Sequence, residues 1–210
     1  MPTPDEILAG LISITNRGFI FAVAWHLLVG AGLIAASQEW RASARLEGAL
    51  LTAPLLSVSA FAWGIEDRFT GTVFLALSAA LGLISWRSNR ADVPRQKWTS
   101  VLGVVLISFA WVYPEFLRGW PQVTSLIASP MGLIPCPTLA LVMGFTLLGY
   151  GPASRGWAVV LALAASFYAG FGVMRLGVKL DLVLLVGAMG LAVRALGRPR
   201  GAERRLQLVH

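Results

Sequence analysis

Residues 129–141 read SPMGLIPCPTLAL and interrupt an otherwise apolar sequence with three prolines and a glycine. Pro130, Pro135 and Pro137 have no amide proton to donate, and Gly132 can adopt backbone conformations that other residues avoid. At membrane depth, such a break is tolerated only where protein buries it or where it lines a wet cavity. The stretch therefore predicts a re-entrant or surface-lying segment that re-enters the membrane as a helix, with Pro137 near the first turn of that helix.

The composition of the whole chain supports this membrane setting. Of its 210 residues, 57% are hydrophobic and 13% are charged, and the mean hydropathy is +0.73. Soluble domains carry roughly 45–50% apolar and about 25% charged residues. A water-soluble fold could not cover so much apolar surface. Because the backbone in lipid must satisfy its own hydrogen bonds, the sequence predicts an all-α, multi-pass transmembrane helix bundle.

Seven apolar stretches approach the roughly 20 residues that are needed to cross a bilayer about 30 Å thick. They are residues 18–37, 46–65, 69–86, 98–117, 131–150, 156–174 and 179–196. We predict seven spans, with the proline-broken segment before the fifth. An arrangement with six spans is the alternative.

The flanking segments complete the predicted domain organisation. Residues 1–17 contain a capping box, in which Thr3 precedes Glu6 by three positions, and Pro4 suits the first helical position. We expect a short interfacial helix there, followed by the bundle in residues 18–196. Residues 197–210 form a basic tail of the kind that attracts anionic lipids at the cytoplasmic surface.

The positions of the basic residues orient the chain. The formal net charge is +7, but the basic residues do not share a patch that would favour nucleic acid. With the N-terminus outside, most of the 17 Lys and Arg residues fall in cytoplasmic connections and the tail. This positive-inside bias agrees with an odd number of spans and with a cytoplasmic C-terminus.

Two polar residues inside the spans are candidates for function. Asp181 lies early in the last span, where an uncompensated carboxylate would be costly. It could form an interfacial salt bridge with Lys179 or Arg175, or it could handle a proton or cation in the bundle interior. His26 lies in the middle of the first span, and we expect it to face the interior with a hydrogen-bond partner, as a proton relay, a ligand or a packed side chain.

Cys136, the one cysteine, cannot form a disulfide within the chain. At a helix N-terminus, the dipole and free amides favour a thiolate or a bound anion. A lone buried cysteine also behaves as a small hydrophobe, and Pro-Cys-Pro could simply shape a turn. A metal site would need Glu115, Asp181 or His26 beside the thiolate, and the sequence implies no metal and no cofactor.

The same region carries a family resemblance. The matching positions are Tyr113, Pro114, Gly119, Pro130, Gly132, Pro135, Cys136, Pro137 and Thr138. In this pattern the chain resembles bacterial membrane proteins of the domain-of-unknown-function family 6064, which are often labelled permeases. The resemblance implies a multi-pass bundle in the bacterial inner membrane and a role for Cys136, and the later LGVKLD would match a family stretch that ends in an acidic residue, here Asp181.

Our leading functional hypothesis is a permease or transporter of a small solute or ion with a site near the outer leaflet. The candidate site residues are Cys136, Glu115, Asp181, His26 and Tyr113. The alternatives are a non-catalytic structural subunit that binds partner subunits of a larger membrane complex, and a thiol-dependent membrane enzyme or redox helper. An enzyme is the least supported, because the sequence shows no nucleophile–base pair and no metal-ligand spacing.

Overall fold

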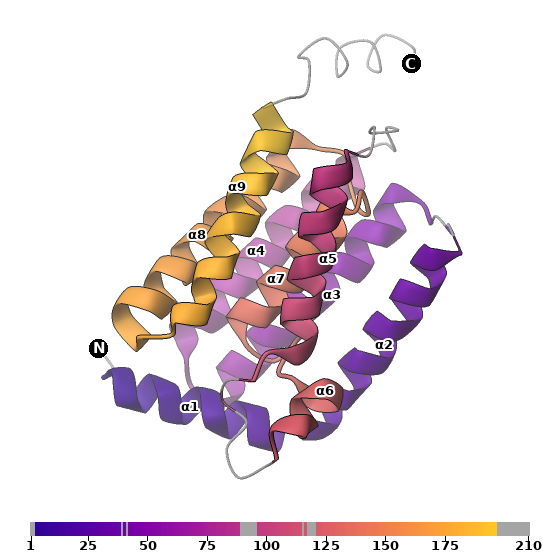
Figure 1. The fold of residues 1–210 in the computed structure, drawn as a ribbon. Helices are drawn as coiled ribbons and strands as arrows, with labels where there is room; N and C mark the ends of the chain where they lie inside the picture. The colour runs from indigo at the N-terminus through magenta and orange to yellow at the C-terminus, as the bar shows by residue number, and fades with distance from the viewer. Residues whose placement is uncertain are drawn as a thin grey trace, which may run out of the picture.

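A computed structural model describes residues 3–38, 40, 42–88, 96–114, 116 and 121–196. Within these ranges every regular element is a helix, and most of the helices run side by side in a bundle (Figure 1). In chain order they are α1 (Pro4–Arg17), α2 (Phe19–Ser37), α3 (Ala44–Gly64), α4 (Arg68–Arg87), α5 (Lys97–Val112), η1 (Gln122–Thr124), α6 (Ser125–Ala128), α7 (Pro135–Leu147), α8 (Arg155–Leu176), η2 (Lys179–Asp181) and α9 (Leu182–Leu196).

Each of the seven predicted apolar stretches overlaps a helix, and these helices are α2, α3, α4, α5, α7, α8 and α9. Four of these, α2, α3, α4 and α8, are long and apolar enough to cross a membrane. Four helices of this kind identify a helical membrane protein. The other three are shorter than the predicted stretches.

The three shorter helices have local causes. Helix α5 ends at Val112 and not at residue 117, because Pro114 cannot continue the hydrogen-bonding pattern. Helix α7 begins at Pro135 and not at residue 131, since a turn with Gly132 at φ +77° precedes it. Helix α9 begins at Leu182, after a short 3₁₀ helix that ends at Asp181.

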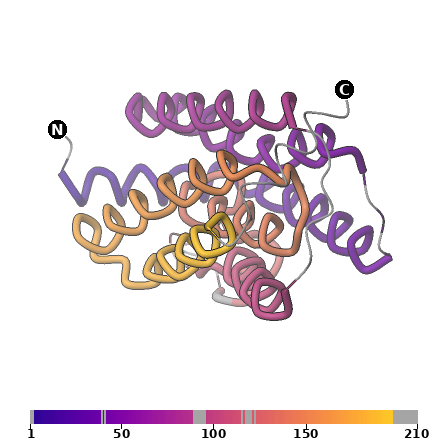
Figure 2. The backbone as a smooth tube through the Cα atoms, turned by 90° about the horizontal axis from the view of Figure 1, so that it is seen from above, coloured from indigo at the N-terminus to yellow at the C-terminus, as the bar shows by residue number. Residues whose placement is uncertain are grey.

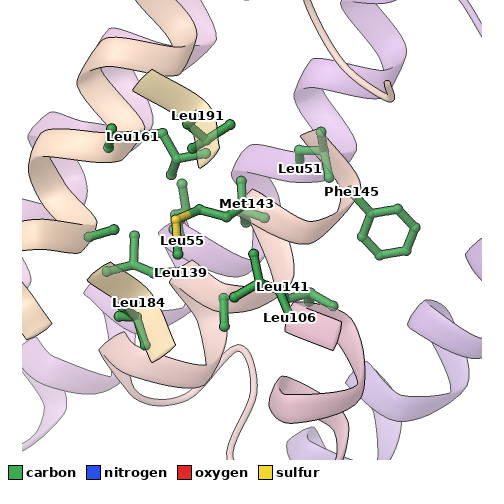
Figure 3. Close-up of a cluster of buried hydrophobic side chains, with 14 of the residues drawn as sticks. Leu51, Leu55, Leu106, Leu139, Leu141, Met143, Phe145, Leu161, Leu184 and Leu191 are labelled. Carbon is green, nitrogen blue, oxygen red and sulfur yellow. The ribbon is translucent and has the colours of Figure 1, made fainter. Parts of the chain in front are cut away.

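Helix α7 lies in the middle of the bundle and packs against α3, α5, α8 and α9 (Figure 2). Nearly all of its side chains are buried, and Met143 lies among leucines from the surrounding helices (Figure 3). The α5–α7 contact is especially close, because a Cβ at Gly144 would lie 2.8 Å from the backbone oxygen of Gly103. Small residues at such contacts let membrane helices approach each other's backbones.

Helix α1 lies across one end of the bundle (Figure 1). Its capping box is confirmed, since the Glu6 amide donates to Thr3 Oγ1 and the Thr3 amide donates to Glu6 Oε2 at 2.7 Å. Pro4 occupies the first helical position, as predicted. We call this end the α1 end; it also holds the α3–α4 turn, the segment between α5 and α7, and the α8–α9 connection.

The opposite end, which we call the basic end, carries a different charge. Among the described residues it holds the cationic side chains Arg45, Arg87, Lys97, Arg155 and Arg194, with Glu47 as the acidic one. At the α1 end the described charges nearly balance: the basic residues are Arg17, Arg68, Arg175 and Lys179, and the acidic ones are Asp5, Glu6, Glu66, Asp67 and Asp181. The predicted basic tail lies outside the described residues.

Candidate functional site

Three of the candidate site residues meet at the α1 end. The Asp181 carboxylate is 2% exposed, and it accepts hydrogen bonds from two side chains. The Tyr113 hydroxyl donates to Oδ1 at 3.0 Å, and the Cys136 thiol donates to Oδ2 at 3.0 Å. We call these three residues the Asp181 cluster.

Every member of the Asp181 cluster lies at an interruption of a helix. Tyr113 follows the last residue of α5, Cys136 is the second residue of α7, and Asp181 lies between α8 and α9. The hydrogen bonds therefore tie together four helices through their ends. They come from residues distant in sequence, whereas the sequence suggested the neighbours Lys179 and Arg175 as partners.

Space for the carboxylate is left by a glycine of α8. A Cβ at Gly172 would lie 2.0 Å from Asp181 Oδ2 and 2.9 Å from its Cγ, so no side chain fits there without displacing Asp181. Sequence reasoning missed Gly172. A usable signal was its spacing from Ala165 and Ala169, which places three small residues along one buried face of α8.

The broken segment before α7 is held by Thr138. Its Oγ1 accepts the Gly132 amide at 2.8 Å and donates to the Ile134 carbonyl at 2.6 Å, inside a fully buried site. Glycine is needed at position 132 for two reasons. Its φ is +77°, and a Cβ would lie 2.3 Å from Cδ1 of Trp25. The prolines and Thr138 of this motif thus position Cys136 at the start of α7.

The end of α5 is completed by residues from other elements. Pro114 has no amide proton for the carbonyl of Ala110, four residues earlier, and Ser129 Oγ donates to that carbonyl at 2.6 Å. His26 is 4% exposed and faces the interior, as expected, with Nε2 3.2 Å from the Trp111 carbonyl oxygen and Nδ1 2.9 Å from that of Ala22. His26 therefore supports the end of α5 and does not contact the Asp181 cluster through these bonds.

A cavity of about 360 Å³ lies at the α1 end of the bundle. It is lined by Leu8 and Ile12 of α1, by Phe116, and by residues 176–180, which lead directly to Asp181. Phe116 packs in the same hydrophobic cluster as Tyr113. The described lining ends one residue before Asp181, and none of the three cluster residues lines the cavity. Glu115, the fifth candidate, lies outside the described residues.

The contacts of Asp181 indicate what the cluster can do. A tyrosine hydroxyl and a thiol that both donate to a carboxylate stabilise its ionised form. A thiolate at Cys136, one of the alternatives that the sequence left open, fits this arrangement poorly, because its charge would lie against that of Asp181. The geometry favours a neutral thiol as donor. Within the described ranges, no group of three His, Cys, Asp or Glu side chains is placed to bind a metal ion.

A second buried carboxylate was missed by sequence reasoning. Glu47, in α3, is 7% exposed, and its Oε2 accepts the Gly151 amide at 2.8 Å. An available signal was its position inside the predicted span 46–65, where acidic residues are rare. Glu47 lies at the basic end, far along the chain from the residues of the Asp181 cluster.

Comparisons of the chain with protein-family models, curated proteins and solved structures find no match. What bears on function is therefore the geometry of the Asp181 cluster and its surroundings. These are a buried acid, two side-chain donors, a cavity at the same end of the bundle and interrupted helices.

Proposed function

We propose that the protein is a permease-like transporter that moves a small solute or ion across the membrane, with Asp181 taking up and releasing a proton. The observation that carries this proposal is the buried carboxylate of Asp181, which receives hydrogen bonds from Tyr113 and Cys136 at helix interruptions. Ionisable residues inside membrane bundles are costly, and they mark substrate and ion pathways and proton relays. Transporters build their sites from interrupted helices.

The geometry couples a proton on Asp181 to the positions of the helices. When Asp181 is ionised, both of its oxygens accept hydrogen bonds, one from the end of α5 and one from the start of α7. A protonated carboxyl has one donor and less acceptor capacity, so at least one of these bonds weakens or reverses. Binding a proton therefore loosens a contact that holds helix ends together, which is the kind of two-state element that transport requires.

For the arrangement in the membrane, we propose seven crossings, with the N-terminus outside and the C-terminus cytoplasmic. Helix α7 has 13 residues and is roughly 20 Å long, so the broken segment before it would complete its crossing. The basic end would face the cytoplasm, and the Asp181 cluster would lie near the outer leaflet. The setting would be a bacterial inner membrane, in keeping with the resemblance to domain-of-unknown-function family 6064.

Proton movement can be tested with the purified full chain in liposomes that contain a pH-sensitive dye. A potassium gradient with valinomycin sets the membrane potential, and the dye reports protons that enter. We expect uptake by the wild type and its loss in Asp181→Asn, which keeps the size of the side chain but cannot exchange the proton. Dye response is measured in parallel with thermal unfolding, so that loss of fold is recognised.

Glu66→Gln is the matched control, because Glu66 is an exposed acid in the α3–α4 turn at the same end of the bundle. It should leave proton uptake unchanged. Equal proton uptake by the wild type, by Asp181→Asn and by liposomes without protein would contradict the proposal. Folded wild-type protein without proton movement would favour a structural subunit.

A further inference from the structure

A groove of about 230 Å³ runs along α2, and none of the residues of the Asp181 cluster lines it. It is bounded by α2, α3 and α7, and its lining is almost entirely apolar. In Figure 3, Phe145 of α7 points away from the other labelled core side chains, and it lines this groove. Because α2 and α3 both qualify as membrane-crossing helices, hydrocarbon surrounds the groove.

Small residues create the groove. On α2 it is lined by Gly32, Ala35 and Ala36, and on α3 by Ala53 and Pro54. The nearest atom to a Cβ at Gly32 would be Cζ of Phe145 at 3.9 Å, so side-chain space is free there. At the core glycines Gly144 and Gly187, by contrast, a Cβ would lie within 3.0 Å of a neighbouring side chain. At Gly32 a Cβ would make only an ordinary van der Waals contact with Phe145, so the groove is not closed at this position.

The groove has a polar end. It begins near Trp25 in the middle of α2 and finishes at Trp40, Glu47 and Tyr150 at the basic end. The Tyr150 hydroxyl donates to the Ala36 carbonyl at 3.4 Å, and Glu47 accepts the Gly151 amide. Tryptophan and tyrosine favour the level of lipid headgroups. This end of the groove therefore lies where the hydrocarbon meets the headgroups.

Positive charge lies at the same end of the bundle, although none of the described residues that line the groove is basic. Arg45 lies in the first turn of α3, two residues before Glu47, and its guanidinium lies over the ring of Trp86, 5.2 Å from the ring centroid. The other described cations of the basic end lie on α4, α5, α8 and α9. Basic residues at a membrane surface attract anionic lipid headgroups, each contributing about 1 kcal/mol.

We propose that this groove binds one acyl chain of an anionic phospholipid, whose phosphate lies among the basic residues near Arg45. Pockets that enclose a whole drug-sized ligand measure roughly 300–1,000 Å³. The groove is smaller than this, so it can hold only part of a lipid. The apolar wall takes the chain, and the charge of the basic end selects the headgroup. This site is separate from the Asp181 cluster and does not depend on the transport proposal.

The test is native mass spectrometry of the delipidated full chain, titrated with dioleoyl phosphatidylglycerol or dioleoyl phosphatidylcholine. We expect one tightly held phosphatidylglycerol. Gly32→Leu, which fills the groove, should weaken this binding by about tenfold. Gly30→Leu is the matched control on the same helix. A Cβ at Gly30 would point to another face of α2, where it would meet Trp111 at 3.5 Å. This variant should bind lipid as the wild type does. Arg45→Gln should bring phosphatidylglycerol binding close to that of phosphatidylcholine.

Ala35→Phe provides a second groove-filling variant in case Gly32→Leu does not fold, and thermal unfolding of all variants identifies such a case. Equal phosphatidylglycerol binding by Gly32→Leu, Gly30→Leu and the wild type would overturn the proposal. Binding of free oleate as tight as that of phosphatidylglycerol would overturn the assignment to a phospholipid. A dimer that disappears in Gly32→Leu, without any lipid adduct in the wild type, would assign the groove to a second copy of the chain.

Discussion

The position of Asp181 depends on its hydrogen bonds and also on the absence of a side chain at Gly172. Tyr113 and Cys136 hold its two oxygens, and Gly172 leaves the space that the carboxylate fills. A buried carboxylate needs both conditions, because burial without hydrogen-bond partners would be costly. The position of a single glycine on α8 is thus part of the site.

Gly172→Ala should destabilise the protein and disturb the Asp181 cluster. A Cβ would lie 2.0 Å from Oδ2, so the carboxylate must move, and overpacking of this kind costs about 1–3 kcal/mol. Gly170→Ala is the control, because its Cβ would meet the flexible end of Met174 at 3.3 Å. Both variants gain the same helix propensity, about 1 kcal/mol. Thermal unfolding in detergent should show a lower Tm for Gly172→Ala than for Gly170→Ala, and equal values would refute the steric argument.

At the scale of elements, the interruptions of the helices are satisfied by specific side chains. Ser129 replaces the amide that Pro114 lacks, His26 contacts the next carbonyl, and Thr138 fixes the turn at Gly132. Breaks in the backbone at membrane depth are stable only when their polar groups have such partners. The prolines therefore shape the site without leaving these groups unpaired.

Thr138→Val tests the importance of the turn before α7. Valine matches the shape of threonine but leaves the buried Gly132 amide without this acceptor, at a cost of about 1–3 kcal/mol. Thr15→Val is the matched control: Thr15 is also fully buried, and its hydroxyl bonds the Leu11 carbonyl of its own helix. Chemical unfolding in detergent should show a clear loss of stability for Thr138→Val and a smaller one for Thr15→Val. The reverse order would mean that the turn is held by its prolines.

Local rules predict the helix boundaries better than they predict the site. The capping box at Thr3 and Glu6 and the proline at the start of α7 follow from neighbouring residues, and the structure has both. The partners of Asp181 are 68 and 45 residues away, so local pattern could propose Tyr113 and Cys136 as candidates but not as a pair around one carboxylate. Gly172 and Glu47 were missed because their roles depend on packing between helices.

At the scale of the whole molecule, the bundle is built around a short helix, and the net positive charge of its described residues lies at one end. Helix α7 is apolar on every side because α3, α5, α8 and α9 surround it. A helix that is hydrophobic all round is buried in protein or crosses the membrane. The seven-span and six-span arrangements differ in whether α5 and α7 both cross the membrane. If both cross, the residues before α5 and those after α7 lie on the same side of the membrane.

Single cysteines in a Cys136→Ser background can distinguish the two topologies in intact bacterial cells. Lys97→Cys is at the first residue of α5, and Gly156→Cys is at the second residue of α8, after α7. Both residues are exposed at the basic end. Seven spans with this end in the cytoplasm predict that a membrane-impermeant maleimide labels neither until the cells are permeabilised. Asp5→Cys, exposed on α1, should be labelled from outside. Labelling of just one of Lys97→Cys and Gly156→Cys would instead show an odd number of crossings between them. The six-span arrangement would then hold, because the two basic segments on either side of α5 and α7 would face opposite sides of the membrane.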